Sequence, residues 1–136
     1  MSNALFGKGR GRFAEAQLSW TSDTIKACLI VTGVYSVSID AHEYWSDVSS
    51  SAYTGITPIT LGSKTSTLGV LDAADITFSA VSGSAIGAII LYKDTGSPAS
   101  SPLMLYLDTA TGLPINPNGG DIIAQWDSGP NRIVKL

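Results

Sequence analysis

Charged side chains are scarce in this sequence. Asp, Glu, Lys and Arg make up 14% of its 136 residues, whereas an average soluble protein has about a quarter. The net charge of −3 supplies no field that would draw the chain to nucleic acid or to an anionic membrane. We therefore expect neither as a direct partner. A weakly charged surface instead favours association with other proteins.

Cysteine and histidine are also nearly absent, with one residue of each, Cys28 and His42. A single cysteine excludes an internal disulfide and any site built from several cysteines. Cys28 lies in the apolar run of residues 27–31, which predicts a buried, unreactive thiol. A nucleophilic triad would need His42, but no Gly-x-Ser-x-Gly elbow or cysteine motif accompanies it. We interpret His42 and Glu43 as a polar loop pair.

Long hydrophobic runs are missing as well. No apolar stretch approaches the roughly 20 residues that span a bilayer, and no charged segment followed by an apolar one opens the chain as in a secretion signal. We therefore expect a protein that is made in a cytosol and is kept or assembled there.

Short β-type segments separated by turn residues make up most of the chain. We predict strands at residues 24–31, 35–39, 67–71, 75–80, 85–92, 103–107, 121–126 and 132–136. One helical turn is expected at residues 42–48, capped by Asp40. Alternation puts three sets of side chains on inner faces: Ile76, Phe78 and Ala80; Leu103, Leu105 and Leu107; and Ile122, Ala124 and Trp126.

These elements predict an all-β fold, because no strand is followed by a long helical pattern. The arrangement we expect is a two-sheet antiparallel sandwich of jelly-roll type, with a barrel as the alternative. Residues 17–136 form this sandwich domain in our interpretation, and residues 1–16 form an N-terminal arm or short helix.

The N-terminal segment carries three of the eight basic residues, with glycine at alternate positions in Gly7-Lys8-Gly9-Arg10-Gly11-Arg12. Each glycine costs about 1 kcal/mol in a helix interior, which favours an arm, or a helix held by contacts. The segment lacks the preceding strand and the Lys-Ser/Thr ending of a phosphate-binding loop. It could bind nucleic acid, order against an acidic protein surface, or act as a solubilising tail. We favour the protein surface, because no other basic cluster accompanies it.

Three further groups of residues invite a functional interpretation. Asp94-Thr95-Gly96-Ser97 matches the segment around the catalytic aspartate of aspartic proteases, but Lys93 and Pro98 depart from that pattern, and we interpret it as a turn. Asp72 and Asp75 lack the spacing of a calcium loop, and we expect no cofactor or metal. The aromatic residues Tyr44, Trp45 and Tyr53 either cover one end of the sandwich or stack on sugars from an exposed position.

Four phrases of the sequence are distinctive: Met1-Ser2-Asn3-Ala4-Leu5-Phe6-Gly7-Lys8-Gly9-Arg10, Trp20-Thr21-Ser22-Asp23-Thr24-Ile25-Lys26, Tyr106-Leu107-Asp108-Thr109-Ala110-Thr111-Gly112-Leu113-Pro114 and Pro117-Asn118-Gly119-Gly120-Asp121-Ile122. With them the chain resembles small virion proteins from the structural modules of tailed bacteriophages. Such proteins are similar to capsid cement or decoration proteins with a jelly-roll-like β fold. The resemblance implies no catalytic residue.

What the resemblance implies is a structural role on the outer surface of a phage capsid. The protein would be made in the cytoplasm of the bacterial host, bind the major capsid protein as a dimer or trimer, and stabilise the seams of the shell. We expect the contact in the N-terminal segment, with Leu5, Phe6 and Phe13 as apolar anchors and Lys8, Arg10 and Arg12 pairing with acidic groups. The alternatives are a head–tail connector or tail-tube component and a surface sugar-binding module with Trp45 in its groove.

Overall fold

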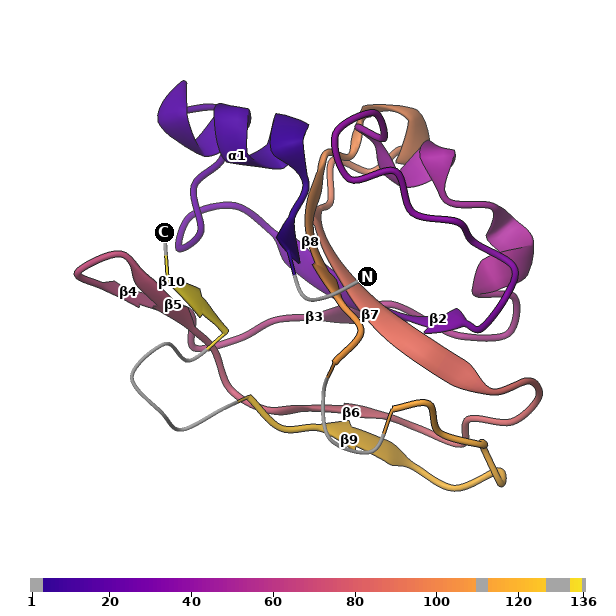
Figure 1. The fold of residues 1–136 in the computed structure, drawn as a ribbon. Coiled ribbons are helices and arrows are strands. Elements are labelled where there is room, and N and C mark those ends of the chain that lie inside the picture. Colours follow the sequence, from indigo (N-terminus) through magenta and orange to yellow (C-terminus); the bar gives the residue numbers. More distant parts are fainter. Residues whose placement is uncertain (1–3, 110–112, 127–132, 136) are drawn as a thin grey trace.

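The computed structural model describes residues 4–109, 113–126 and 133–135. Its centre is a five-stranded antiparallel sheet with the strand order β1-β8-β7-β2-β3 (Figure 1). The five strands are β1 (Ala4–Leu5), β2 (Ile25–Val31), β3 (Ile59–Thr60), β7 (Ile86–Lys93) and β8 (Leu103–Leu107). The expectation of a mostly antiparallel β fold is therefore confirmed.

The two longest strands, β2 and β7, pair along their full length, from Ile25 opposite Lys93 to Val31 opposite Ile86. Both faces of this pair are buried. On β2, Ala27 and Leu29 belong to one core cluster, whereas Cys28 belongs to the other. Strands covered on both faces read as continuous apolar runs instead of alternating patterns, which explains the composition of both segments.

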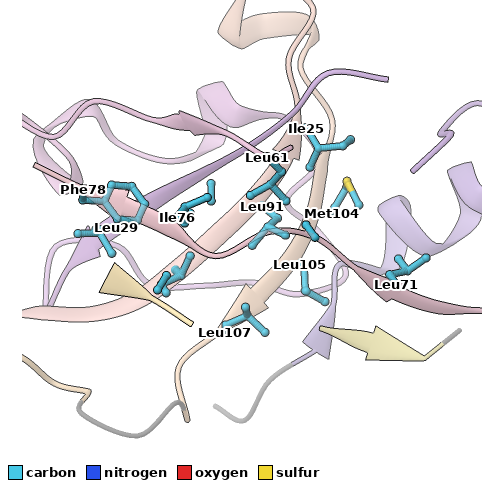
Figure 2. Packing of buried hydrophobic residues seen from close by; sticks show 14 of the residues in the cluster. Ile25, Leu29, Leu61, Leu71, Ile76, Phe78, Leu91, Met104, Leu105 and Leu107 are labelled. Atoms are coloured by element: carbon cyan, nitrogen blue, oxygen red, sulfur yellow. The ribbon is translucent and has the colours of Figure 1, made fainter. Parts of the chain in front are cut away.

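Two small sheets contribute to the core on one face of the central sheet. One has the order β10-β5-β4, and the other pairs β6 with β9. Their strands are β4 (Thr65–Thr67), β5 (Val70–Asp72), β10 (Val134–Lys135), β6 (Ile76–Phe78) and β9 (Ile122–Ala124). Figure 2 shows the resulting core, in which Leu71, Ile76 and Phe78 from the small sheets pack with side chains of β2, β7 and β8.

The core on the opposite face includes residues from largely irregular chain and from the N-terminal segment. Residues 33–58 contain two short 3₁₀ helices, η1 (Trp45–Asp47) and η2 (Ser50–Ala52). Trp45 and Val48 bury their side chains against this face. A third 3₁₀ turn, η3 (Pro98–Ser100), lies close to η1, and the one α-helix of the described chain, α1 (Gly7–Ala14), packs beside β8.

Several expected elements differ from the structure. Residues 35–39 form no strand, although Tyr35, Val37 and Ile39 are half-buried against the core. Their alternation reflects an extended segment that packs on one side without pairing. The helical turn after residue 42 is capped by Asp47, whose carboxylate accepts hydrogen bonds from the backbone N–H groups of Glu43 and Tyr44. Asp40 is not its cap.

One β-bulge changes the predicted face of Leu103. Leu91 pairs with Leu105 but Tyr92 pairs with Leu103, so Met104 is an extra residue in β8. A bulge reverses the alternation beyond it, and Leu103 therefore packs in the opposite cluster from Leu105. The prediction of a shared face for the three leucines of β8 was wrong.

Residues 67–71 form a hairpin instead of one strand. Strands β4 and β5 pair across a two-residue turn at Leu68 and Gly69, both of which have positive φ, 51° and 78°. Ala80 was also predicted wrongly, because it is exposed at φ 52° beyond the end of β6. The predicted inner face of residues 122, 124 and 126 is confirmed. Of the predicted strand at residues 132–136, β10 is present, and residues 132 and 136 lie outside the described chain.

Candidate functional site

The N-terminal segment, which we predicted to be the contact surface, is folded onto the body of the protein. Ala4 and Leu5 of β1 pair with Tyr106 and Leu105 of β8. Helix α1 follows directly and lies above β8 (Figure 1). The segment is therefore the edge of the central sheet followed by a helix, with a defined surface.

Glycine makes the close approach of this helix to the sheet possible. A Cβ atom on Gly9 would lie 2.5 Å from the carbonyl oxygen of Leu103 and 3.2 Å from the Cα atom of Met104. Such contacts are too short for any side chain, whereas a Cβ on Gly11 would meet nothing within 4 Å. The glycines of α1 disfavour a helix, so packing against β8 stabilises the helical conformation of residues 7–14.

The three predicted apolar anchors differ in their accessibility. Phe6 is fully buried in the core cluster that contains Ile30, Ile90 and Trp45, and its backbone N–H donates to the carbonyl oxygen of Met104. It is therefore a core residue of its own domain and is not presented to a partner. Leu5 and Phe13 are half-buried against the other cluster.

The three predicted basic residues also differ in their exposure and in their contacts. The guanidinium of Arg12, with 18% of its side chain exposed, is 2.5 Å from the Glu43 carboxylate. It also donates to the Tyr44 hydroxyl at 3.1 Å and lies 5.3 Å from the centre of that ring. Lys8 is nearly half exposed and 3.7 Å from Glu43, and Arg10 is exposed. Arg12 therefore ties α1 to the loop at residues 43–44, and the outward-facing basic groups are Lys8 and Arg10.

His42 forms a small polar cluster with Tyr35. The Nδ1 atom of His42 accepts a hydrogen bond from the backbone N–H of Ser38, at 3.3 Å. A backbone N–H can only donate, so Nδ1 carries no proton and the Tyr35 hydroxyl, 2.6 Å away, also donates to it. Burial raises the pKa of Tyr35, as do the nearby Asp47 and Tyr106. This hydrogen bond connects Tyr35 with His42 within one loop, and the raised pKa of Tyr35 keeps its hydroxyl protonated at neutral pH.

A shallow hollow beside this cluster has a volume of about 160 Å³. Its lining includes Tyr35, Tyr106, Gly33, Gly87 and Asp108. Pockets for small molecules have volumes of about 300–1,000 Å³. The hollow is thus too small for a ligand of that class.

The aromatic residues that could have stacked on sugars are packed inside. Trp45 is buried, with its ring stacked on Tyr92 at 4.4 Å and tilted against Tyr53 at 4.5 Å. Tyr44 and Tyr53 are half-buried. Of the two interpretations, burial is confirmed for Trp45, whose side chain lies in the core on one face of the central sheet and is not available as a sugar platform.

Asp94, the candidate protease aspartate, has a structural role. One carboxylate oxygen accepts a hydrogen bond from the backbone N–H of Gly96, at 3.0 Å, and the other is 3.2 Å from the Lys26 ammonium. Both contacts favour the ionised form, and they lower the pKa of Asp94. This geometry is the Asx turn expected from the sequence, and the carboxylate is engaged within its own chain.

Asp72, Asp75 and Cys28 are the remaining candidates for a metal ligand or a nucleophile. In the described ranges no three His, Cys, Asp or Glu side chains gather as metal ligands do. The Asp75 carboxylate accepts a hydrogen bond from the backbone N–H of Trp126. Cys28 is fully buried, and burial raises the pKa of its thiol from 9.0 to about 12, as expected for an unreactive core cysteine.

We expect native Cys28 to resist alkylation at about pH 8 and to react after unfolding. Because the pKa is raised in the folded state, its contribution to stability is complete below the ordinary pKa and is lost as the pH rises toward about 12. Stability measured by denaturant unfolding should therefore fall more steeply above about pH 9 in the wild type than in Cys28→Ala. Equal slopes, or rapid labelling of the native protein, would contradict this placement.

One exposed apolar residue, Leu68, was not identified from the sequence. Leu68, at the tip of the β4–β5 hairpin, is 93% exposed, more than any other large apolar side chain of the described chain. The sequence carried half of the usual hairpin signal, because glycine, here Gly69, is typical of the second position of a two-residue turn, whereas leucine is unusual at the first.

Comparisons with known proteins add no functional assignment to this geometry. None of the helices in the described ranges is long and apolar enough to cross a membrane. Neither a scan against models of protein families nor a search of curated proteins found a match to this chain.

Proposed function

We propose that the chain is a structural protein of a bacteriophage virion, and that it decorates the outer surface of the capsid. The proposal starts from the resemblance of its sequence to small phage virion proteins. The observation that supports the proposal most directly is the exposure of Lys8 and Arg10 on helix α1. This helix is anchored to β8 before any partner binds. A contact surface that is already ordered loses little conformational entropy on binding.

The chemistry of this surface favours an acidic protein partner. Arg12 is occupied by Glu43 and Tyr44. Lys8 lies 3.7 Å from the same Glu43 carboxylate but is nearly half exposed, so Lys8 and Arg10 are the basic groups that can face a partner. Each exposed ion pair contributes only about 0.2–1 kcal/mol, so one copy would bind weakly through this pair. Weak contacts become effective on a shell that presents the same site many times when copies are linked to one another.

Two finer features belong to this proposal. The first is the jelly-roll arrangement of the sandwich, for which the packing of β6 and β5 side chains against the central sheet is the supporting feature. The second is the contact with major capsid proteins along their seams, where a rigid β domain with a weakly charged surface would bury apolar area on both sides at about 25 cal/mol per Å².

Co-sedimentation of the purified protein with expanded, undecorated phage shells tests the proposal. We expect saturable binding at a fixed ratio to the major capsid protein. Replacing both outward basic groups, in Lys8→Gln/Arg10→Gln, should weaken binding about 2- to 30-fold at low salt, because up to two exposed ion pairs are lost. The difference from wild type should shrink at higher salt.

The matched control changes the net charge equally at another place. Ser51→Glu/Thr57→Glu alters two exposed residues of the irregular segment and also lowers the charge by two, so its binding should exceed that of the glutamine variant. Wild-type protein that stays in the supernatant would contradict the capsid role. Rings or filaments of the protein alone would favour the tail-tube alternative instead.

A further inference from the structure

The β4–β5 hairpin combines two features that folding by itself disfavours. Leu68 occupies the left-handed region at φ 51°, which suits Asn, Asp or Gly at the first position of such a two-residue turn. Its side chain is also 93% exposed. A leucine at this φ is a strained backbone position, and strain of this kind is a reason to look for a functional contact.

The outer edge of the hairpin is open for pairing. Strand β4 is the edge of the sheet β10-β5-β4, and its three residues are exposed. The backbone carbonyl group of Leu71 in β5 points toward β10, because its oxygen accepts a hydrogen bond from the backbone N–H of Ile133. Ser66 is the residue opposite Leu71, and in an antiparallel pair its own N–H and C=O must then point away from β5. These two groups form the free edge.

This edge lacks the features that normally block strand pairing. Natural edges carry charges, proline or bulges, but residues 65–70 contain no charged residue and no proline, and their pairing with β5 has no register shift. The central sheet ends in β1 and β3, which are only two residues long. In Figure 1 the hairpin reaches out from the body of the protein, so a second chain can approach it.

We propose that β4 pairs antiparallel with β4 of a second copy of this chain, about a two-fold axis at Ser66. The two serines then exchange both backbone hydrogen bonds, and Thr65 lies opposite Thr67 of the other copy. Residues 65–67 are neutral and meet their own copies without like-charge repulsion, and Lys64 at the end of the paired stretch lies opposite a neutral residue. The two three-stranded sheets become one sheet of six strands.

With Ser66 opposite Ser66 of the second copy, Leu68 lies opposite Lys64 of that copy. The exposed leucine side chain therefore gains a contact in the dimer. The Lys64 ammonium donates to the carbonyl oxygen of Asp23 in its own chain, so its methylene groups remain for contact with a leucine. Strand β4 is only three residues long, so we expect an interface smaller than the roughly 1,200 Å² typical of stable complexes. The dimer is therefore weak and reversible, and it depends on no part of the capsid role.

Sedimentation velocity across a range from micromolar to millimolar protein tests the pairing. Wild-type protein should shift from monomer toward dimer with concentration. Ser66→Pro removes the outward N–H without removing a bond of the hairpin, and should weaken the dimer at least about tenfold, since both exchanged bonds are lost. Ser66→Ala keeps the N–H and should dimerise like the wild type.

Two more variants separate pairing from folding. Leu68→Asn should raise the thermal midpoint, because Asn suits the turn, and yet weaken the dimer. Ser66→Lys keeps the N–H but sets two charges opposite each other, so its dimer should be lost at low salt and partly restored at high salt. A wild-type protein that stays monomeric at every concentration overturns the proposal, as does a folded Ser66→Lys variant that dimerises like the wild type.

Discussion

Phe6→Ala is expected to destabilise the protein by about 3–5 kcal/mol, the usual cost of removing a buried phenylalanine side chain. The ring is fully buried among Cys28, Ile30 and Trp45, so truncation leaves a cavity in the core. Small domains are stable by only about 5–15 kcal/mol, and the variant should therefore be partly unfolded at moderate denaturant. Denaturant unfolding followed by tryptophan fluorescence measures the loss.

A matched variant in the same segment is Phe13→Ala. Phe13 is only half-buried, so this change should cost clearly less than Phe6→Ala. If Phe6 served as an outward anchor, its replacement would leave the unfolding midpoint unchanged and reduce partner binding alone. That result would contradict the packing of β1 and α1 described above.

Two alanine substitutions two residues apart in helix α1 should change stability in opposite directions. Gly9→Ala should destabilise by about 1–3 kcal/mol, the usual cost of overpacking, because its Cβ would lie 2.5 Å from the Leu103 carbonyl oxygen. Gly11→Ala should stabilise by about 0.5–1 kcal/mol, because alanine favours the helix and its Cβ meets nothing within 4 Å.

The comparison of these two variants is internally controlled, since the side chain added is the same. Both free energies come from denaturant unfolding at one pH. Stabilisation by both substitutions would mean that α1 does not rest on β8. Destabilisation by both would mean that residues 7–14 do not form a helix in solution.

Much of the central sheet could be predicted from the sequence, because strands buried on both faces need long apolar and β-branched runs. Strand β8 has the predicted bounds, and β2 and β7 differ by one residue at their ends. The two-residue strands β1 and β3 carry no local signal, since only pairing with the sheet makes them strands. The bulge at Met104 likewise depends on pairing with β7. The β4–β5 turn was missed because leucine is unusual at φ 51°.

The candidate site was predictable in its chemistry but not in its geometry. An apolar residue near an N-terminus has the same appearance whether it anchors a partner or fills its own core, and Phe6 does the latter. Arg12 and Glu43 are 31 residues apart, so no short-range pattern indicates their pairing. The basic residues Lys8 and Arg10 are visible in the sequence, and only the fold shows that they are exposed while Arg12 is mostly buried.

The pairing of β1 with β8 has a consequence for synthesis of the chain. Leu5 leaves the ribosome about 100 residues before Leu105, its partner in the sheet, which corresponds to about 5–20 s at elongation rates of about 5–20 residues per second. During this interval the first strand and its glycine-rich neighbour have no sheet to join, and Phe6 has no complete core to enter. Strand β1 and helix α1 therefore wait for β8 before they can take their places, and a nascent chain halted before residue 103 would display the residues of β1 and α1 to chaperones.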